Sequence, residues 1–281
     1  MSHTKCAVSL LAIAGLAAVT QAQALVQLEV SSAGAEQWSN TFNEAIPGGS
    51  VDVRVKVSYN GTAQPLGLAS MYMQPTVSNW RTTGSIDTLA PLHNAGQGSN
   101  ISNPSGGVFD AVGQFGRITP YANRSTSGSL ALTGFVQAVS GTTYLRIAQA
   151  YATDWIGTGF NATGGRGIPI SQLNDVGRTS FEPAFANSTQ NVVVFKFRIN
   201  LSADPGGRSL TVNIPPDAFG NLNTSTNTRE IRWYANMSEA TGSIVGAATV
   251  VPATINLIIP SPASLAALGM GGLVLARRRR C

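Results

Sequence analysis

The chain contains very few of the residues that usually carry out chemistry. In 281 residues it has two cysteines, Cys6 and Cys281, and two histidines, His3 and His93. The body between the two chain ends therefore has no thiol nucleophile, no disulfide and no cysteine ligand for zinc. A Ser-His-Asp site would have to use His93, and the sequence has no G-x-S-x-G elbow. We expect no catalytic residue, no metal-binding residue and no cofactor, although a calcium site built from loop oxygens stays open.

Charge is also scarce, and its positive excess lies at the ends. Charged residues make up 11% of the chain, with 18 Lys and Arg against 13 Asp and Glu. Five of the basic residues lie in the terminal segments: Lys5, Arg277, Arg278, Arg279 and Arg280. The body is then neutral, and because no basic cluster remains in it, we expect no nucleic-acid partner.

The N-terminal residues have the composition of a secretory signal peptide. Lys5 precedes an apolar run over residues 7–19, and the small-residue pattern at Ala22 and Ala24 is typical of a cleavage site. We expect residues 1–24 to be a signal-peptide helix that is removed after Ala24.

The C-terminal residues form a second hydrophobic segment with a basic end. An uncharged run over residues 263–276 spans roughly 21 Å as a helix, less than the roughly 30 Å of a bilayer core. Starting the helix at Leu257 brings it close to the required length. Four arginines after the run favour the cytoplasmic side, which leaves the body outside the cytoplasm. The segment is bounded by these residues: Pro260, Ser261, Pro262, Arg277, Arg278, Arg279 and Arg280.

This order of proline motif, hydrophobic run and arginines resembles the PEP-CTERM sorting domain of bacterial exosortase substrates. The resemblance covers residues 256–281 and implies that an exosortase-type membrane protease cuts near the proline motif. It also implies delivery to the cell surface or into extracellular polymer. Ser261 replaces the usual Glu of the motif, and Cys281 follows the arginines. The alternative is an ordinary membrane anchor.

The body has the pattern of an all-β protein. Residues 51–59 (VDVRVKVSY) and 192–201 (VVVFKFRINL) alternate apolar and polar side chains, as strands with one buried face do. Asn60-Gly61 is a dipeptide typical of hairpin turns. Further strands are expected at residues 26–30, 66–73, 130–139, 144–152, 209–214, 230–237 and 247–257. We predict a single antiparallel β-sandwich over residues 25–255, because no segment keeps a helical period and no linker divides it.

Parts of the body are weakly similar to known secreted domains. The segments PGGSVDVRVKVSYNG and VVVFKFRINLSADPGGRSLTV look like the opening and closing strands of cohesin-type or carbohydrate-binding-module-type sandwiches. The similarity supports the architecture and not a ligand. Two polar, glycine-rich segments at residues 93–107 and 157–167 interrupt the strands, and we interpret them as mobile loops.

Three functions agree with these observations. The first is a non-enzymatic secreted or cell-surface protein, a structural component of the envelope or extracellular matrix, whose partners are the sorting protease, the membrane and extracellular polysaccharide. The second is a carbohydrate-binding or cohesin-like adhesion module, with Trp80 and Trp155 as candidate glycan contacts because both adjoin polar loops, whereas Trp233 fits a core strand. The third is a glycoside hydrolase, which needs only two carboxylates such as Asp154 and Glu182.

Overall fold

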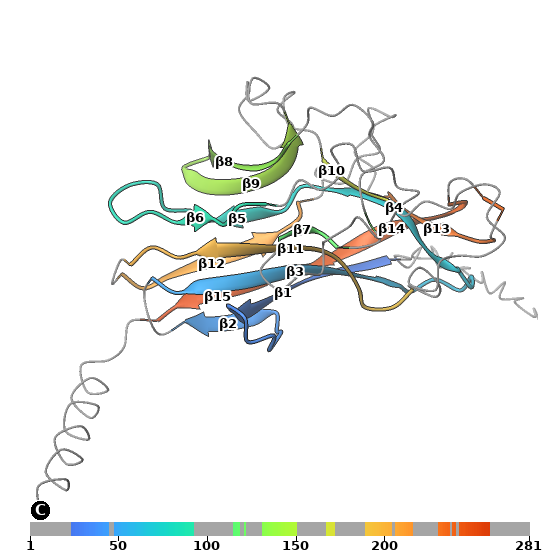
Figure 1. Ribbon diagram of the computed structural model, residues 1–281, viewed down its shortest axis with the longest axis horizontal. Coiled ribbons are helices and arrows are strands. Elements are labelled where there is room, and N and C mark those ends of the chain that lie inside the picture. Colours follow the sequence, from blue (N-terminus) through green and yellow to red (C-terminus); the bar gives the residue numbers. More distant parts are fainter. Residues whose placement is uncertain are drawn as a thin grey trace, which may run out of the picture.

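The computed structural model describes residues 24–44, 48–92, 115–118, 121, 131–150, 167–171, 189–203, 206–215, 230–236, 238–239 and 242–258. Within these residues the regular structure is entirely β and forms two sheets (Figure 1). The nine-stranded sheet has the order β10 (Ile168–Ser171), β4 (Gly67–Met73), β13 (Glu230–Tyr234), β14 (Ile244–Val251), β1 (Ala24–Ser32), β3 (Ser50–Tyr59), β11 (Val192–Asn200) and β6 (Thr88–Leu89), and β7 (Gly116–Arg117) also pairs with β11. The six-stranded sheet has the order β2 (Thr41–Glu44), β15 (Ala253–Leu257), β12 (Arg208–Asn213), β5 (Thr76–Ser78), β9 (Thr142–Ala150) and β8 (Ala131–Val139).

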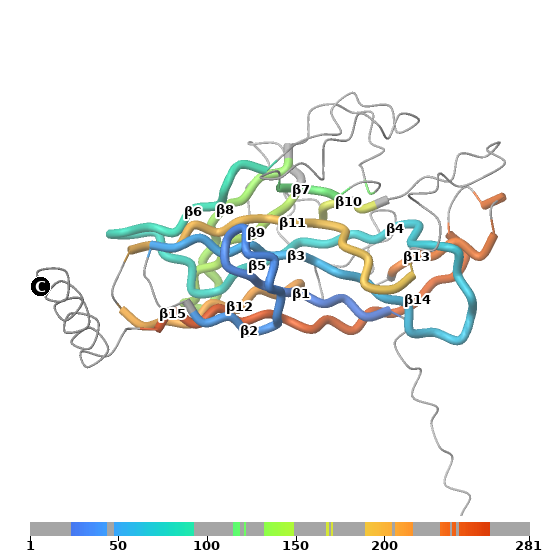
Figure 2. The backbone as a smooth tube through the Cα atoms, turned by 60° about the horizontal axis from the view of Figure 1, so that its bottom comes forward, coloured from blue at the N-terminus to red at the C-terminus, as the bar shows by residue number. Residues whose placement is uncertain are grey.

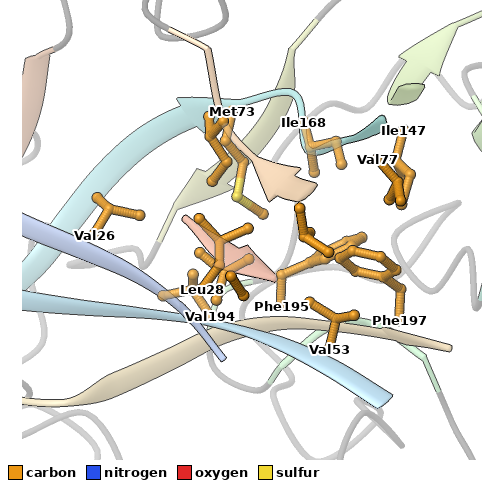
Figure 3. Close-up of a cluster of buried hydrophobic side chains, with 14 of the residues drawn as sticks. Val26, Leu28, Val53, Met73, Val77, Ile147, Ile168, Val194, Phe195 and Phe197 are labelled. Atoms are coloured by element: carbon orange, nitrogen blue, oxygen red, sulfur yellow. The ribbon is translucent and has the colours of Figure 1, made fainter. Parts of the chain in front are cut away.

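The core lies between the inner faces of the two sheets. In β3 every second side chain from Val51 to Val57 is fully buried, and in β11 Phe195 and Phe197 are buried beside them. Val77 of β5 and Ile147 of β9 meet this cluster from the six-stranded sheet (Figure 3). Each such side chain contributes about 1.5–3 kcal/mol by leaving water. The alternation seen in the sequence therefore selects the buried face, as predicted.

The expectation of a purely antiparallel sandwich needs correction, because two strand pairs are parallel. β1 pairs in parallel with β14, and β2 pairs in parallel with β15. β14 and β15 are consecutive strands that lie in different sheets, with Pro252 between them, and β1 and β2 likewise lie in different sheets. The segment β1–β2 and the segment β14–β15 both pass from the nine-stranded to the six-stranded sheet, and they run side by side in the same direction. Proline suits the crossing point because it lacks a backbone donor for either ladder.

The hairpin predicted at Asn60-Gly61 is also wrong. β3 and β4 follow each other in sequence, but β1, β14 and β13 lie between them in the sheet. After Tyr59 the chain passes these three strands and re-enters the sheet as β4, beyond β13. The structure instead has a tight hairpin between β8 and β9, where Ser140 and Gly141 have φ values of 48° and 80°. Two successive positive φ values are the signature of a type I′ turn, which suits the twist of paired strands.

The other strand predictions are largely confirmed within a few residues. The expected strand at 247–257 is divided into β14 and β15. The first residues of the predicted tail are corrected, because Asn256 and Leu257 belong to β15 and a helix cannot begin at Leu257, and Ala24 likewise begins β1 instead of ending a signal-peptide helix. Residues 1–23, residues 259–281, residues 93–107 and nearly all of residues 157–167 lie outside the described residues. In the part of the chain that is described, no helix has the length and apolarity needed to cross a membrane.

Candidate interaction surface

The structure describes one of the two tryptophans predicted to contact glycan, and that one is buried. Trp80 is 5% exposed and belongs to the hydrophobic core, so its predicted role as a glycan contact is corrected. Its backbone N–H donates to the Thr143 carbonyl at 2.9 Å, which attaches this residue to β9, and its side chain is buried despite its polar neighbours in sequence. Trp233 is fully buried, as predicted. Among the described residues no aromatic side chain is fully exposed, and Trp155 lies outside them.

The remaining sequence-predicted site residues fall largely outside the described residues. Ala22 and the sorting residues Pro260, Ser261, Pro262, Arg277, Arg278, Arg279 and Arg280 are among them, as are Asp154 and Glu182. Ala24 is described: it is the first residue of β1, is 1% exposed, and pairs with Tyr59 and Ala248. A chain cut after Ala24 would keep the other eight residues of the nine-residue strand β1.

A polar surface held by ion pairs lies on the outer face of the nine-stranded sheet, where β1, β3 and β11 run side by side (Figure 2). Because the valines of β3 point into the core, the alternating residues between them point outward. Register places Glu29 of β1 opposite Arg54 of β3, and Arg54 opposite Lys196 of β11. Asp52 of β3 is opposite Arg198 of β11 in the same way. We call Arg54, Lys56, Lys196 and Arg198 the cationic strip.

Glu29 holds two members of the strip. Its Oε2 accepts from Arg54 Nε at 2.7 Å and lies 2.6 Å from a second guanidinium nitrogen, while its Oε1 lies 2.7 Å from Lys56 Nζ. Burial by itself raises the pKa of Glu29, but the hydrogen bonds and positive charges of Lys56 and Arg54 outweigh it and lower the pKa. Glu29 is thus a fixed anion that positions two cations.

Asp52 holds Arg198 in a bidentate pair. Arg198 Nε donates to Asp52 Oδ1 at 2.6 Å and its terminal nitrogen donates to Oδ2 at 2.9 Å. The backbone N–H of Gly34 donates to the same Oδ2 at 3.0 Å. The hydrogen bond with Asp52 raises the pKa of Arg198 above its usual value. Two parallel bonds fix the plane of the guanidinium as well as its position.

Two aromatic rings cover the arginines of the strip. The guanidinium carbon of Arg54 lies 4.5 Å from the centre of the Trp38 ring, and that of Arg198 lies 4.8 Å from the centre of the Phe115 ring. Such cation–π contacts stabilise a positive charge while leaving the opposite face of the guanidinium available. Trp38 therefore helps to hold Arg54 in place.

The strip carries more positive than negative charge. Its four cations are matched on this face by two carboxylates, Glu29 and Asp52, which are engaged by Arg54, Lys56 and Arg198. Within the described ranges, no carboxylate lies within ion-pair distance of Lys196. The other three cations of the strip each pair with Glu29 or Asp52. The result is a rigid array with one spare ammonium, which suits the binding of an anionic group.

The described carboxylates do not favour acid–base catalysis. Glycoside hydrolysis needs a carboxylic acid whose pKa is raised, together with a second carboxylate across a cleft. Glu29 has a lowered pKa, and so does Glu239, for which hydrogen bonds from Ser243, Ala235 and Asn236 outweigh the opposing effect of burial. No group of three potential metal ligands occurs in the described part of the chain.

A second charged cluster is structural. The Asp87 carboxylate is fully buried and accepts the backbone N–H groups of Arg81 and Ser202, each at 2.8 Å. Arg208 donates to both of its oxygens, and also to the Asn79 carbonyl at 2.7 Å and to Ser202 Oγ at 3.0 Å. These bonds attach the segment from Asn79 to Asp87, which precedes β6, to the loop after β11 and to the first residue of β12. No local sequence signal marks this pair, because 121 residues separate its members.

The comparisons with known proteins add limited information. No protein-family model matches this chain, and no curated protein matches it. The seventh ScaB type I cohesin from Pseudobacteroides cellulosolvens is similar with a TM-score of 0.35 and 9% identity over 85% of this chain and 94% of that chain. The third ScaB cohesin of R. flavefaciens, solved in complex with a group 1 dockerin, gives a TM-score of 0.34 and 11% identity over 86% of this chain and 99% of that one.

A third solved structure, a type I cohesin in a cohesin–dockerin complex from Clostridium thermocellum, gives a TM-score of 0.33 and 9% identity over 83% of this chain and 99% of that chain. The solved structures are thus of the cohesin type that the β3 and β11 segments resemble in sequence. The likeness is weak, and we assign no property of those domains to this chain because of it.

Proposed function

We propose that the chain is an exported, non-enzymatic adhesion module of the cell surface or extracellular matrix, and that the cationic strip binds acidic polysaccharide. The observation that carries this proposal is the excess of positive charge on an ordered face, with Lys196 unmatched beside arginines already held by Glu29 and Asp52. A preorganised cation loses little side-chain entropy when it binds an anion.

The chemistry of the strip favours a polymer over a small anion. The cations alternate along β3 and β11, so neighbouring charges on one strand are about 7 Å apart and the row continues onto the next strand. A flexible polyanion can contact several of them together, which adds weak contacts into useful affinity. A single carboxylate would meet only Lys196.

The test measures binding of the purified protein to an acidic polyuronate and to a neutral glucan by affinity electrophoresis at low and high salt. We expect retardation by the polyuronate alone, weakened by salt because the contacts are ionic. Lys196→Gln should weaken binding about tenfold, since a hydrogen bond to a charged group contributes about 1.5 kcal/mol.

Arg232→Gln is the matched control for this experiment. It removes one positive charge from β13 of the same sheet, four strands from β11 and hence about 19 Å from Lys196. The proposal fails if the two variants lose affinity equally, or if the glucan retards the protein as strongly as the polyuronate. Equal binding to duplex DNA would show that the strip detects charge alone and would also contradict a polysaccharide function.

Export and sorting form the other half of the proposal. Residues 1–24 would direct secretion and residues 256–281 would hold the body at the membrane until an exosortase-type protease cuts near Pro260 and Pro262. Mass spectrometry of the protein from envelope and medium, with and without the sorting protease, tests this. If the arginine tail persists in every fraction whether or not the protease is present, the tail is a plain anchor.

A further inference from the structure

β8 is the only long edge strand among the described strands that lacks a protective feature. The other edges are short or interrupted: β6 and β7 have two residues each, β2 has four and ends in Glu44, and β10 has four and contains Pro169. β8 has nine residues, ALTGFVQAV, with no charged residue and no proline. Proteins usually protect exposed edges with charges, prolines, bulges or short strands, because an open edge accepts another strand.

The pairing of β8 is also regular, so the backbone groups on its outer edge follow one another at even spacing. β8 and β9 match over nine consecutive residue pairs without a register shift. β11 and β13, by contrast, each contain an irregularity in their ladders. Figure 1 shows β8 at the outer margin of the curved β8–β9 hairpin.

Backbone hydrogen bonds on the far side of β9 tell which groups of β8 point outward. The Thr143 carbonyl accepts from Trp80 N–H at 2.9 Å and Ile147 N–H donates to the Pro75 carbonyl at 2.8 Å, so both groups point away from β8. In an antiparallel pair the residues opposite them also point away. Thr143 is opposite Ala138 and Ile147 is opposite Gly134.

The same alternation turns four residues of β8 away from β9: Leu132, which already has a partner, and Gly134, Val136 and Ala138, which form the open half of the edge. Within the described part of the chain none of the three has a backbone partner beyond β9. The Val136 side chain is 46% exposed, and Ala138 is exposed as well. This half of the strand is thus accessible at both its backbone and its side chains.

We propose that this edge pairs with the same edge of a second copy of the chain, antiparallel and centred on Val136. In that arrangement Val136 pairs with Val136 of the second copy, and Gly134 pairs with Ala138 in both directions. Each residue in these pairs offers its outward N–H and C=O, so the symmetric pairing leaves none of the three unsatisfied. The two exposed valines cover each other.

The sequence of β8 favours a second copy over an unrelated strand. A two-fold axis places identical residues near each other, and like charges there would repel. β8 has no charge, so self-pairing meets no repulsion, and the order Gly134, Val136, Ala138 places small residues on both sides of the central valine pair. The inference does not depend on polysaccharide binding, since the cationic strip lies on the other sheet.

Disulfide trapping tests the pairing in the full chain. Cys6 and Cys281 are first replaced by Ser. Val136→Cys then places one cysteine on each side of the axis with the two α-carbons about 5.5 Å apart, which is within the range that a disulfide spans. We expect mild oxidation to convert most of this variant to a covalent dimer. Val245→Cys is the matched control, because Val245 is 39% exposed on β14, an interior strand of the nine-stranded sheet.

A second variant separates backbone pairing from random collision. Ala138→Pro removes an N–H that points away from β9, so it leaves the hairpin ladder intact while blocking the edge. In the Val136→Cys background it should reduce dimer formation at least tenfold. The proposal is wrong if Val136→Cys is oxidised to dimer no faster than Val245→Cys, or if Ala138→Pro has no effect. Disulfide trapping of a different protein by the Val136→Cys variant in the producing cells would also overturn it.

Discussion

Replacing Asp87 with Ala should destabilise the fold more than any surface charge change. The carboxylate has no exposed area and joins two backbone N–H groups to the guanidinium of Arg208, which is 15% exposed. Asp87→Ala leaves those donors without an acceptor and leaves Arg208 without its counter-ion. Removing one partner of a buried pair costs about 3–5 kcal/mol. For a protein of this size that corresponds to a fall in Tm of about 10 °C.

The measurement is thermal and urea unfolding followed by circular dichroism. Asp52→Ala is the matched control, since Asp52 also forms a bidentate pair with an arginine, but its partner Arg198 is 28% exposed. Asp52 itself is 13% exposed, so water can reach the groups left behind and the cost should stay at about 1 kcal/mol. The double variant Asp87→Ala/Arg208→Met should cost less than the sum of its single changes, because it leaves no orphaned charge. A cost below about 1 kcal/mol for Asp87→Ala would refute the structural role assigned to the pair.

Two further predictions concern packing and pH. At Gly242 a Cβ would lie 2.6 Å from the Trp233 carbonyl oxygen and 2.7 Å from Ala69 Cβ, so Gly242→Ala should cost about 1–3 kcal/mol in urea unfolding. Gly34→Ala meets nothing within 4 Å and should cost only its backbone strain at φ +75°, about 1 kcal/mol; equal costs would contradict the packing argument. Because the ion pairs lower the pKa of Glu29 from 4.5, their stabilisation is present above that pH and is lost as the pH falls through the lower folded value. Glu29→Gln should therefore lower the urea midpoint at pH 7 and flatten its fall below about pH 4.5, and an unchanged acid slope would disprove this.

Local patterns in the sequence were enough to find the long strands. The alternation in residues 51–59 and 192–201 marks β3 and β11, because burying one face of a strand requires apolar residues at every second position. The same alternation showed that Asp52, Arg54, Lys196 and Arg198 point outward. It did not show that the two strands are neighbours, so the cationic strip could not be recognised before the register was known.

The short strands and the topology had no local signal. β6 and β7 are two residues long and exist only because the β11 edge accepts them. The Asn60-Gly61 dipeptide suggested a hairpin from its turn propensity, yet the apolar residues of β4 are buried on the far side of β13. Trp80 looked exposed from its polar neighbours, and its contact with β9 placed it in the core.

The sequence by itself determined that the body is built of half-buried strands and has as many acidic as basic residues, no cysteine and a single histidine, because those properties depend on composition and on a spacing of two residues. The tertiary structure decided which strands are neighbours, which charges meet and which edge stays open. Those outcomes depend on contacts between residues more than a hundred positions apart, such as Asp87 with Arg208 and Asp52 with Arg198. The free energy of these contacts comes from the assembled sheets, so no single segment encodes it.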